Sequence, residues 1–107
     1  MKISATKNGD SVKAKLQDAL DITTVSEARD NILQLLNSGG SIRFDLSSMT
    51  EIDTAGVQLI LAVRKEASAM GKECRFVHPS PPIEDVFRAL GRSGIFDESV
   101  LTAQAKG

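Results

Sequence analysis

The apolar residues of this chain recur with two spacings in turn, and this alternation limits the possible folds more than any other feature. Every-second-residue patterns predict strands at residues 3–5, 12–16 and 41–46, and a further short strand is expected at 73–77. Helical spacing follows at about residues 24–36, 54–70 and 81–90. Strands that alternate with helices favour a layered α/β domain with parallel strand pairs.

The two earliest strands are expected to form a hairpin. Asn8-Gly9-Asp10 separates the two alternating runs, and Asn-Gly is a strong turn signal because both residues tolerate positive φ. Each later strand follows a helix, and this order of elements predicts two right-handed βαβ units. We therefore expect a single domain over residues 1–107, with a small mixed sheet of about four to five strands and helices packed on it.

Charge and composition exclude several classes of function. The chain has a net charge of -1 and neither Trp nor Tyr, so we expect no nucleic-acid partner. Its single cysteine, Cys74, and single histidine, His78, give no internal disulfide and no Cys/His metal site. No apolar run reaches the roughly 20 residues that span a bilayer, and the N-terminus lacks the pattern of a signal peptide. We expect a cytoplasmic protein without cofactor or direct membrane insertion.

Local signals place the ends of the helices and strands. Thr24 and Glu27 have the spacing of a capping box, which predicts that each side chain bonds the other residue's backbone N–H at the start of the first helix. Ser80 is the expected N-cap of the third helix. The polar residues 47–51 are expected to leave the strand as a loop.

The strand–loop–helix segment at residues 44–57 contains the residues most suited to a functional role. Asp53-Thr54-Ala55-Gly56 falls in the first helical turn, where backbone N–H groups lack intrahelical partners and attract anions. Phosphorylation of Thr54 would add about -2 of charge there. Gly56 would let another protein approach Thr54, and Asp53 would cap the helix or hold the hydroxyl. A second interpretation stays open, because Asp and Thr before a helix are good caps without any further role.

The most informative short sequences are Asp45-Leu46-Ser47, Ile52-Asp53-Thr54-Ala55-Gly56, Met70-Gly71-Lys72, Leu20-Asp21 before the first helix, and the closing Gly94-Ile95-Phe96. Together they resemble the STAS family of bacterial anti-sigma-factor antagonists and their relatives. The resemblance covers nearly the whole chain. Thr54 stands where many antagonists have serine, and the last helix of many members is here shortened to residues 98–106 or missing.

The resemblance implies a regulatory binding protein that is not an enzyme. A serine/threonine kinase that acts as the anti-sigma factor would phosphorylate Thr54 and release the chain, and a phosphatase would reset it. The implied partner-binding residues are Asp21, Asp53, Thr54, Ala55, Gly56 and Val57. Met49 and Val57 are candidate apolar anchors, and the alternative for either residue is a place in the core.

Two alternatives remain. STAS proteins of chemotaxis gene clusters and STAS subunits of lipid-transport ABC complexes look similar, and in the latter the same threonine contacts an ATPase without phosphorylation. A small enzyme or nucleotide binder is the other alternative, but the chain lacks a nucleophile–base pair and a Gly-rich phosphate loop. The carboxylates at 21, 45 and 53 are weak candidates for Mg²⁺.

Overall fold

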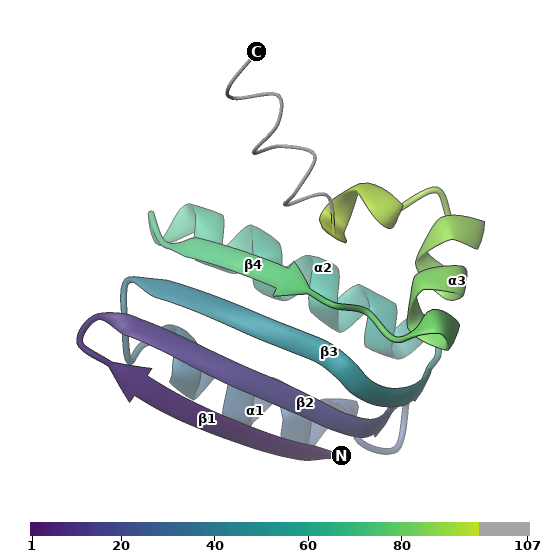
Figure 1. Ribbon diagram of the computed structural model, residues 1–107, viewed down its shortest axis with the longest axis horizontal. Helices are drawn as coiled ribbons and strands as arrows, with labels where there is room; N and C mark the ends of the chain where they lie inside the picture. Colours follow the sequence, from purple (N-terminus) through teal and green to yellow (C-terminus); the bar gives the residue numbers. More distant parts are fainter. Residues whose placement is uncertain (97–107) are drawn as a thin grey trace.

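The computed structural model describes residues 1–96, which form a four-stranded sheet and three helices (Figure 1). The strands are β1 (Lys2–Asn8), β2 (Ser11–Leu20), β3 (Ser41–Ile52) and β4 (Glu73–Val77). The helices are α1 (Val25–Leu36), α2 (Thr54–Ala69) and α3 (Pro81–Ala89), followed by a 3-10 turn, η1 (Ser93–Phe96). No helix within these residues is long and apolar enough to cross a membrane. The helix considered at residues 98–106 lies outside the described range.

The sheet is mixed and its strands lie side by side in chain order. β1 pairs with β2 antiparallel, whereas β2 with β3 and β3 with β4 are parallel. Each parallel pair is joined through a helix, α1 in the earlier pair and α2 in the later one. The predicted fold class, an opening hairpin followed by two βαβ units, is therefore confirmed, with four strands in the described residues.

The hairpin turn is one residue later than the Asn-Gly signal suggests. Asn8 still pairs with Ser11, so Gly9 and Asp10 form the two-residue turn. Gly9 has a φ of 65°, a backbone conformation that costs glycine little because it has no Cβ. The turn is short enough to fix the register of β1 against β2.

The expectation of a loop at residues 47–51 is wrong, because β3 continues to Ile52. The pairing with β2 shifts twice, so that β3 has one extra residue between Asp45 and Ser48 and another between Met49 and Glu51. These bulges break the every-second-residue pattern by which the sequence reveals a strand. The extended pairing brings the ends of β2 and β3 together, with Leu20 opposite Ile52.

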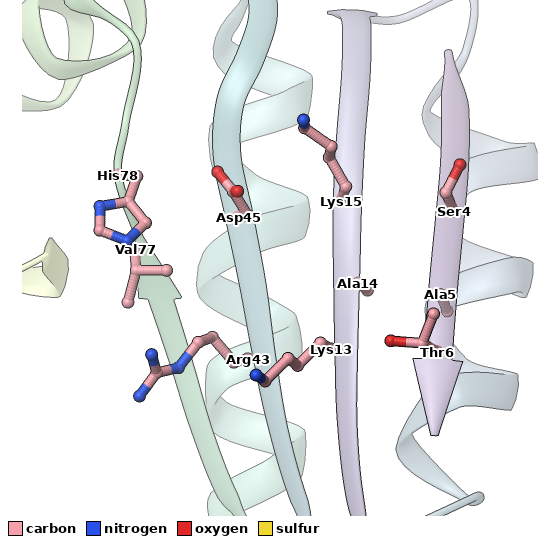
Figure 2. Close-up of a pocket in the computed structure, with 10 residues that line it drawn as sticks. All are labelled: Ser4, Ala5, Thr6, Lys13, Ala14, Lys15, Arg43, Asp45, Val77 and His78. Carbon is pink, nitrogen blue, oxygen red and sulfur yellow. The ribbon is translucent and has the colours of Figure 1, made fainter. Parts of the chain in front are cut away.

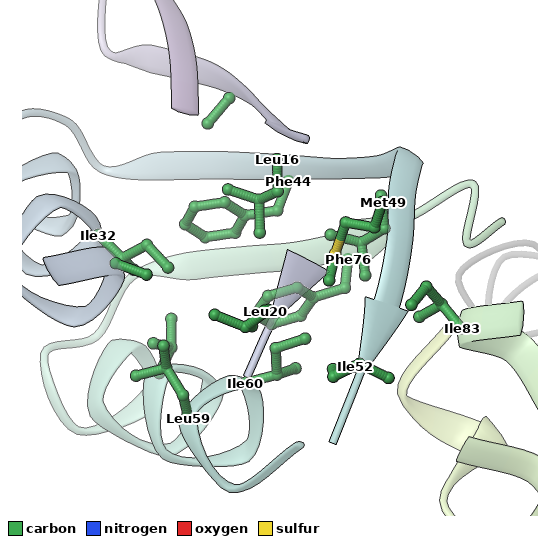
Figure 3. Close-up of a cluster of buried hydrophobic side chains, with 14 of the residues drawn as sticks. Leu16, Leu20, Ile32, Phe44, Met49, Ile52, Leu59, Ile60, Phe76 and Ile83 are labelled. Carbon is green, nitrogen blue, oxygen red and sulfur yellow. The ribbon is translucent and has the colours of Figure 1, made fainter. Parts of the chain in front are cut away.

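The apolar core lies between the sheet and the two longer helices. α1 and α2 cover the same face of the sheet (Figure 1), and Figure 3 shows strand residues such as Leu16 and Phe44 in one cluster with Ile32 of α1 and Ile60 of α2. Phe44 and Phe76 stack on neighbouring strands, with ring centroids 5.1 Å apart. Each such side chain contributes about 1.5–3 kcal/mol when it leaves water, so this cluster fixes where the helices lie on the sheet.

The third helix closes one end of the sheet, beside the end of β3 (Figure 1). α3 begins after Ser80 as predicted, but the Ser80 hydroxyl does not cap the helix and instead donates a 2.6 Å hydrogen bond to the Met49 carbonyl. Phe96 of η1 packs edge-to-face on Phe87 of α3 at 4.9 Å. The segment after β4 is therefore attached to the bulged part of β3.

Candidate functional site

Thr54 is the opening residue of α2 and its side chain is exposed. The helix begins two residues after the end of β3, at the sheet edge where β2 also ends. Thr54 therefore sits on the rim of the molecule, where a macromolecule can reach its hydroxyl.

Asp53 caps α2 and also ties the helix to the loop before α1. One carboxylate oxygen, Oδ1, accepts a 2.9 Å hydrogen bond from the backbone N–H of Gly56. The other, Oδ2, accepts a 2.9 Å hydrogen bond from the N–H of Ile22. Of the two roles expected for Asp53, capping the helix or holding the Thr54 hydroxyl, the cap is confirmed. The same side chain joins the loop of residues 21–24 to the start of α2, although these segments are far apart in the sequence.

Two N–H groups at the start of α2 are left without an intrahelical partner. The N–H of Val57 donates to the Asp53 carbonyl and that of Gly56 to the Asp53 carboxylate. The N–H groups of Thr54 and Ala55 come before the first intrahelical bond of the helix. These two groups and the helix dipole favour a negative charge beside Thr54.

Asp21 is held in a local turn on the adjacent loop. Its Oδ1 accepts hydrogen bonds from the Thr23 hydroxyl at 2.6 Å and from the Thr23 N–H at 2.9 Å. The side-chain hydrogen bond from Thr23, with help from the backbone bond, lowers the pKa of Asp21 below its ordinary value. The carboxylate is therefore charged at neutral pH, on the loop that Asp53 fixes against Thr54.

The predicted capping box at α1 is absent. Thr24 has a helical backbone conformation, and its side chain makes no cap hydrogen bond. Instead its hydroxyl accepts a 3.0 Å hydrogen bond from the Asp21 N–H and lies 3.2 Å from the Ala19 carbonyl, to which it donates. The threonine therefore stabilises the loop of residues 21–24 and not the N–H groups of the helix.

The reason for Gly56 differs from the one expected from the sequence. Gly56 is buried, and a Cβ on it would lie 2.4 Å from the Leu20 carbonyl oxygen and 2.7 Å from Cγ1 of Ile52. Glycine is needed so that α2 can approach the ends of β2 and β3. It does not open a path to Thr54 for another protein.

Both predicted apolar anchors are core residues. Met49 and Val57 are each 2% exposed and belong to the buried cluster. The side chain of Val57 therefore points into the core of the protein and does not reach a partner, because the stripe of α2 that contains it faces the sheet. Ala55 is partly exposed and remains at the surface beside Thr54.

Ile22 is an exposed apolar residue at this site that the sequence analysis did not single out. Its side chain is 71% exposed, while its N–H is bound by Asp53. An isoleucine within the polar run Asp21-Ile22-Thr23-Thr24 lies outside any strand or helix pattern. The sequence could have identified Ile22 by this isolation, because a large apolar side chain with no place in the core pattern is a candidate contact residue.

The single cysteine and the single histidine of the chain lie away from this site. Cys74 is in β4, partly buried, and burial raises the pKa of its thiol to about 11. His78 follows β4 with a φ of 54° and is exposed. Within residues 1–96, no three His, Cys, Asp or Glu side chains come together as a metal site.

The architecture matches solved structures of anti-sigma factor antagonists. The antagonist from Mycobacterium paratuberculosis has a TM-score of 0.76 at 15% identity, over 95% of this chain and 93% of that one. SpoIIAA in its unphosphorylated form has a TM-score of 0.73 at 20% identity, over 99% and 97%. The phosphorylated form of Bacillus SpoIIAA has a TM-score of 0.69 at 20% identity, over 97% and 99%. At sequence identities this low, the structural matches show a shared fold and nothing more.

The sequence comparisons give a more specific result. No curated protein sequence matches the chain. A family model of the STAS domain, however, matches residues 2–104, which is nearly the whole chain. The family resemblance of the short sequences is thereby confirmed, and the chain belongs to the STAS domain family.

Proposed function

We propose that this chain is a regulatory binding module of the anti-sigma-factor-antagonist type, switched by phosphorylation of Thr54. Its partner is a serine/threonine kinase that acts as an anti-sigma factor, and a phosphatase removes the phosphate. The chain is then a substrate of phosphoryl transfer in the cytoplasm and not a catalyst. The observation that carries the proposal is an exposed threonine at the first position of a capped helix, beside an exposed isoleucine held by the same cap.

The docking surface consists of the start of α2 and the loop of residues 21–24. Ile22 supplies apolar area, and burying such a side chain in an interface contributes about 1.5–3 kcal/mol. Asp21 supplies a fixed negative charge for a basic group of the partner. Because Asp53 holds both segments, the surface is formed before binding, and little ordering entropy is lost when the partner docks.

A phosphate on Thr54 acts on this surface without unfolding it. The free N–H groups and the dipole of α2 stabilise a dianion in the unbound chain. In the complex the same dianion loses its water and lies close to the carboxylates of Asp21 and Asp53. A penalty of about 3 kcal/mol weakens binding roughly a hundredfold. The switch therefore requires no large conformational change.

Mass spectrometry after incubation with candidate serine/threonine kinases and ATP tests the modification. We expect phosphate on Thr54 in the wild type, on the serine of Thr54→Ser, and none in Thr54→Ala. Thr50→Ala is the matched control, since Thr50 is also exposed and lies four residues away. Phosphate on another residue, or unchanged labelling of Thr54→Ala, contradicts the proposal.

Binding of the same kinase to variants tests the switch and the surface. We expect Thr54→Ala to bind like the wild type and Thr54→Glu to bind at least tenfold more weakly. Ile22→Ser should also weaken binding about tenfold, because it removes the exposed apolar group. Leu90→Ser is the control, because Leu90 is 52% exposed but follows α3.

A different outcome would favour a constitutive role. Suppose that no kinase modifies Thr54, that an ABC-transporter ATPase or a chemotaxis-cluster protein binds, and that Ile22→Ser weakens that binding. This result would support the docking surface and contradict the phosphorylation switch. If Ile22→Ser and Thr54→Glu both leave every interaction unchanged, the docking surface itself is wrong.

A further inference from the structure

β1 forms one edge of the sheet, and its outer side pairs with no strand of residues 1–96 (Figure 1). Its pairing with β2 is unbroken from Lys2 to Asn8, and every residue of β1 except the partly buried Ile3 is exposed. At the other edge, β4 is shorter and is contacted by η1. A regular, exposed edge strand without proline is a template for another strand. β1 is therefore the edge that is open to further pairing.

The hairpin turn decides which backbone groups of β1 point outward. Asn8 and Ser11 flank a two-residue turn and exchange both of their backbone hydrogen bonds. Hydrogen-bonded pairs alternate with non-hydrogen-bonded pairs along an antiparallel ladder, so every second residue back from Asn8 also bonds β2. The residues between them, Ile3, Ala5 and Lys7, turn their N–H and C=O groups toward the free edge. No strand in the described part of the chain takes up these groups.

The sequence of β1 is compatible with pairing to a second copy of itself. Ala5 is the middle residue of β1. A two-fold axis at Ala5 would set two β1 strands antiparallel, so that each outward residue faces an outward residue of the other copy. Ala5 would face Ala5, and Ile3 would face Lys7. No lysine would stand opposite a lysine, because Lys2 would face Asn8.

The face of β1 away from the helices has small polar side chains at its centre. Figure 2 shows Ser4 and Thr6 on the outermost strand, beside Lys15 and Lys13 of β2, with which they are aligned. In the two-fold arrangement Ser4 would face Thr6 of the second copy, and cross-strand pairs of this kind form hydrogen bonds. Ala5, on the other face, is equally small. No large side chain at the centre of β1 would hold the two backbones apart.

The helix side of this edge supplies a charge complementary to Lys7. Glu27 of α1 and Ile3 line the same small hollow, of about 50 Å³, together with Asn31. Lys7 of a second copy, placed opposite Ile3, would come within reach of Glu27. Both side chains are exposed, and neither forms an ion pair within residues 1–96. The two-fold axis repeats the contact, so a dimer would contain this pair twice.

We propose that the chain forms a dimer in which β1 pairs antiparallel with β1 of a second copy, centred on Ala5. The two sheets then become one continuous sheet, with the helices of both copies on the same face. The backbone hydrogen bonds define the contact, and the pairs of Lys7 with Glu27 fix its register. A single strand pair is a small interface, so the dimer dissociates at low micromolar concentration.

Analytical ultracentrifugation of the full chain tests the association. Concentrations from about 10 µM to about 1 mM cover the range in which small interfaces dissociate. We expect the weight-average mass to rise with concentration from 11.4 kDa toward that of a dimer. Thr54→Glu should associate like the wild type, which keeps this test independent of the phosphorylation switch.

Amide hydrogen exchange, measured by NMR over the same concentrations, locates the contact. The amides of Ile3, Ala5 and Lys7 should gain protection as the concentration rises, because they bond the second copy. The amides of Ser4 and Thr6 should be protected at every concentration, because β2 already binds them. This alternation distinguishes strand pairing from a contact between side chains.

Two sets of variants test the centre and the register. Ala5→Lys sets like charges opposite each other on the two-fold axis and should weaken the dimer at least about tenfold. Ala62→Lys adds the same charge at an exposed position of α2 and should leave the affinity within about twofold. Lys7→Glu and Glu27→Lys should each weaken it about tenfold, since each breaks both ion pairs. The double variant Lys7→Glu/Glu27→Lys should recover the wild-type affinity within about threefold.

Four results would overturn the proposal. One is a chain that stays monomeric at about 1 mM with these amides unprotected. Another is a dimer in which the amides of Ile3, Ala5 and Lys7 gain no protection, because the copies would then meet elsewhere. Protection of the same amides in a monomeric chain would assign the edge to another strand of the same molecule. A double variant as weak as Lys7→Glu alone would exclude the register centred on Ala5.

Discussion

The two long helices begin at the same edge of the sheet but are anchored in different ways. At α1, Thr24 uses its hydroxyl inside its own loop and does not cap the helix, and the N–H of Val25 donates to the nearby Asp21 carbonyl. At α2, Asp53 caps the helix and reaches across to Ile22 in the other loop. The start of α1 is thus stabilised by local contacts, whereas the start of α2 depends on a contact between distant segments. This difference explains how Thr54 can be exposed and yet rigidly positioned.

The largest effect is expected at the third position of α2, and the same position of α1 provides the comparison. Gly56→Ala should destabilise the protein by about 2–3 kcal/mol, because the added Cβ overlaps the Leu20 carbonyl and Ile52. The equivalent position of α1 is Glu27, which is exposed, and Glu27→Ala should change stability by less than about 0.5 kcal/mol. Urea unfolding followed by circular dichroism gives both values. Equal costs at the two positions would show that the close approach of α2 is not what requires glycine.

The next largest effect is expected from Asp53. Asp53→Ala removes the cap and the link to Ile22 and should cost about 1–2 kcal/mol in unfolding free energy. Hydrogen exchange should also speed up at the amides of Ile22 and Gly56, although they are 34 residues apart in the sequence. Asp53→Asn, which keeps an acceptor for one of the two bonds, is the intermediate control. Faster exchange at Gly56 alone would contradict the link between the loops.

A smaller effect is expected at the start of α1. Thr24→Val keeps the shape of the side chain and removes the hydroxyl that bonds the Asp21 N–H and the Ala19 carbonyl, so it should cost about 1 kcal/mol. Exchange should accelerate at the Asp21 amide but not at Gly56. Val25→Thr, at the next position, is a control because it adds a hydroxyl without removing a bond. Faster exchange at Gly56 in Thr24→Val would mean that the two helix starts are not independent.

The same contrast explains what the sequence could predict. The strands, the helices and their alternation follow from local apolar spacing, and Asp53 follows from the residue preference of a helix cap. Residues 47–51 were mistaken for a loop because two bulges in β3 remove the spacing signal. The capping box failed because Thr24 bonds backward to Ala19 and Asp21, and the packing role of Gly56 depends on Leu20. The misses at β3 and Gly56 involve contacts between segments distant in the sequence, which local patterns do not encode, whereas Thr24 has two local partners that compete with the capping box.

The smallest effect concerns the charge on the loop before α1. The Thr23 hydroxyl is the main cause of the lowered pKa of Asp21, so Thr23→Ala should raise that pKa toward its ordinary value. Because the folded state lowers the pKa, the interaction stabilises the fold at neutral pH, and this contribution is lost as pH falls through the folded pKa. A carboxyl ¹³C NMR titration measures the change, and Thr50→Ala should leave the pKa of Asp21 as it is. An unchanged pKa in Thr23→Ala would mean that the backbone N–H donors of the loop, and not the Thr23 hydroxyl, hold the pKa of Asp21 down.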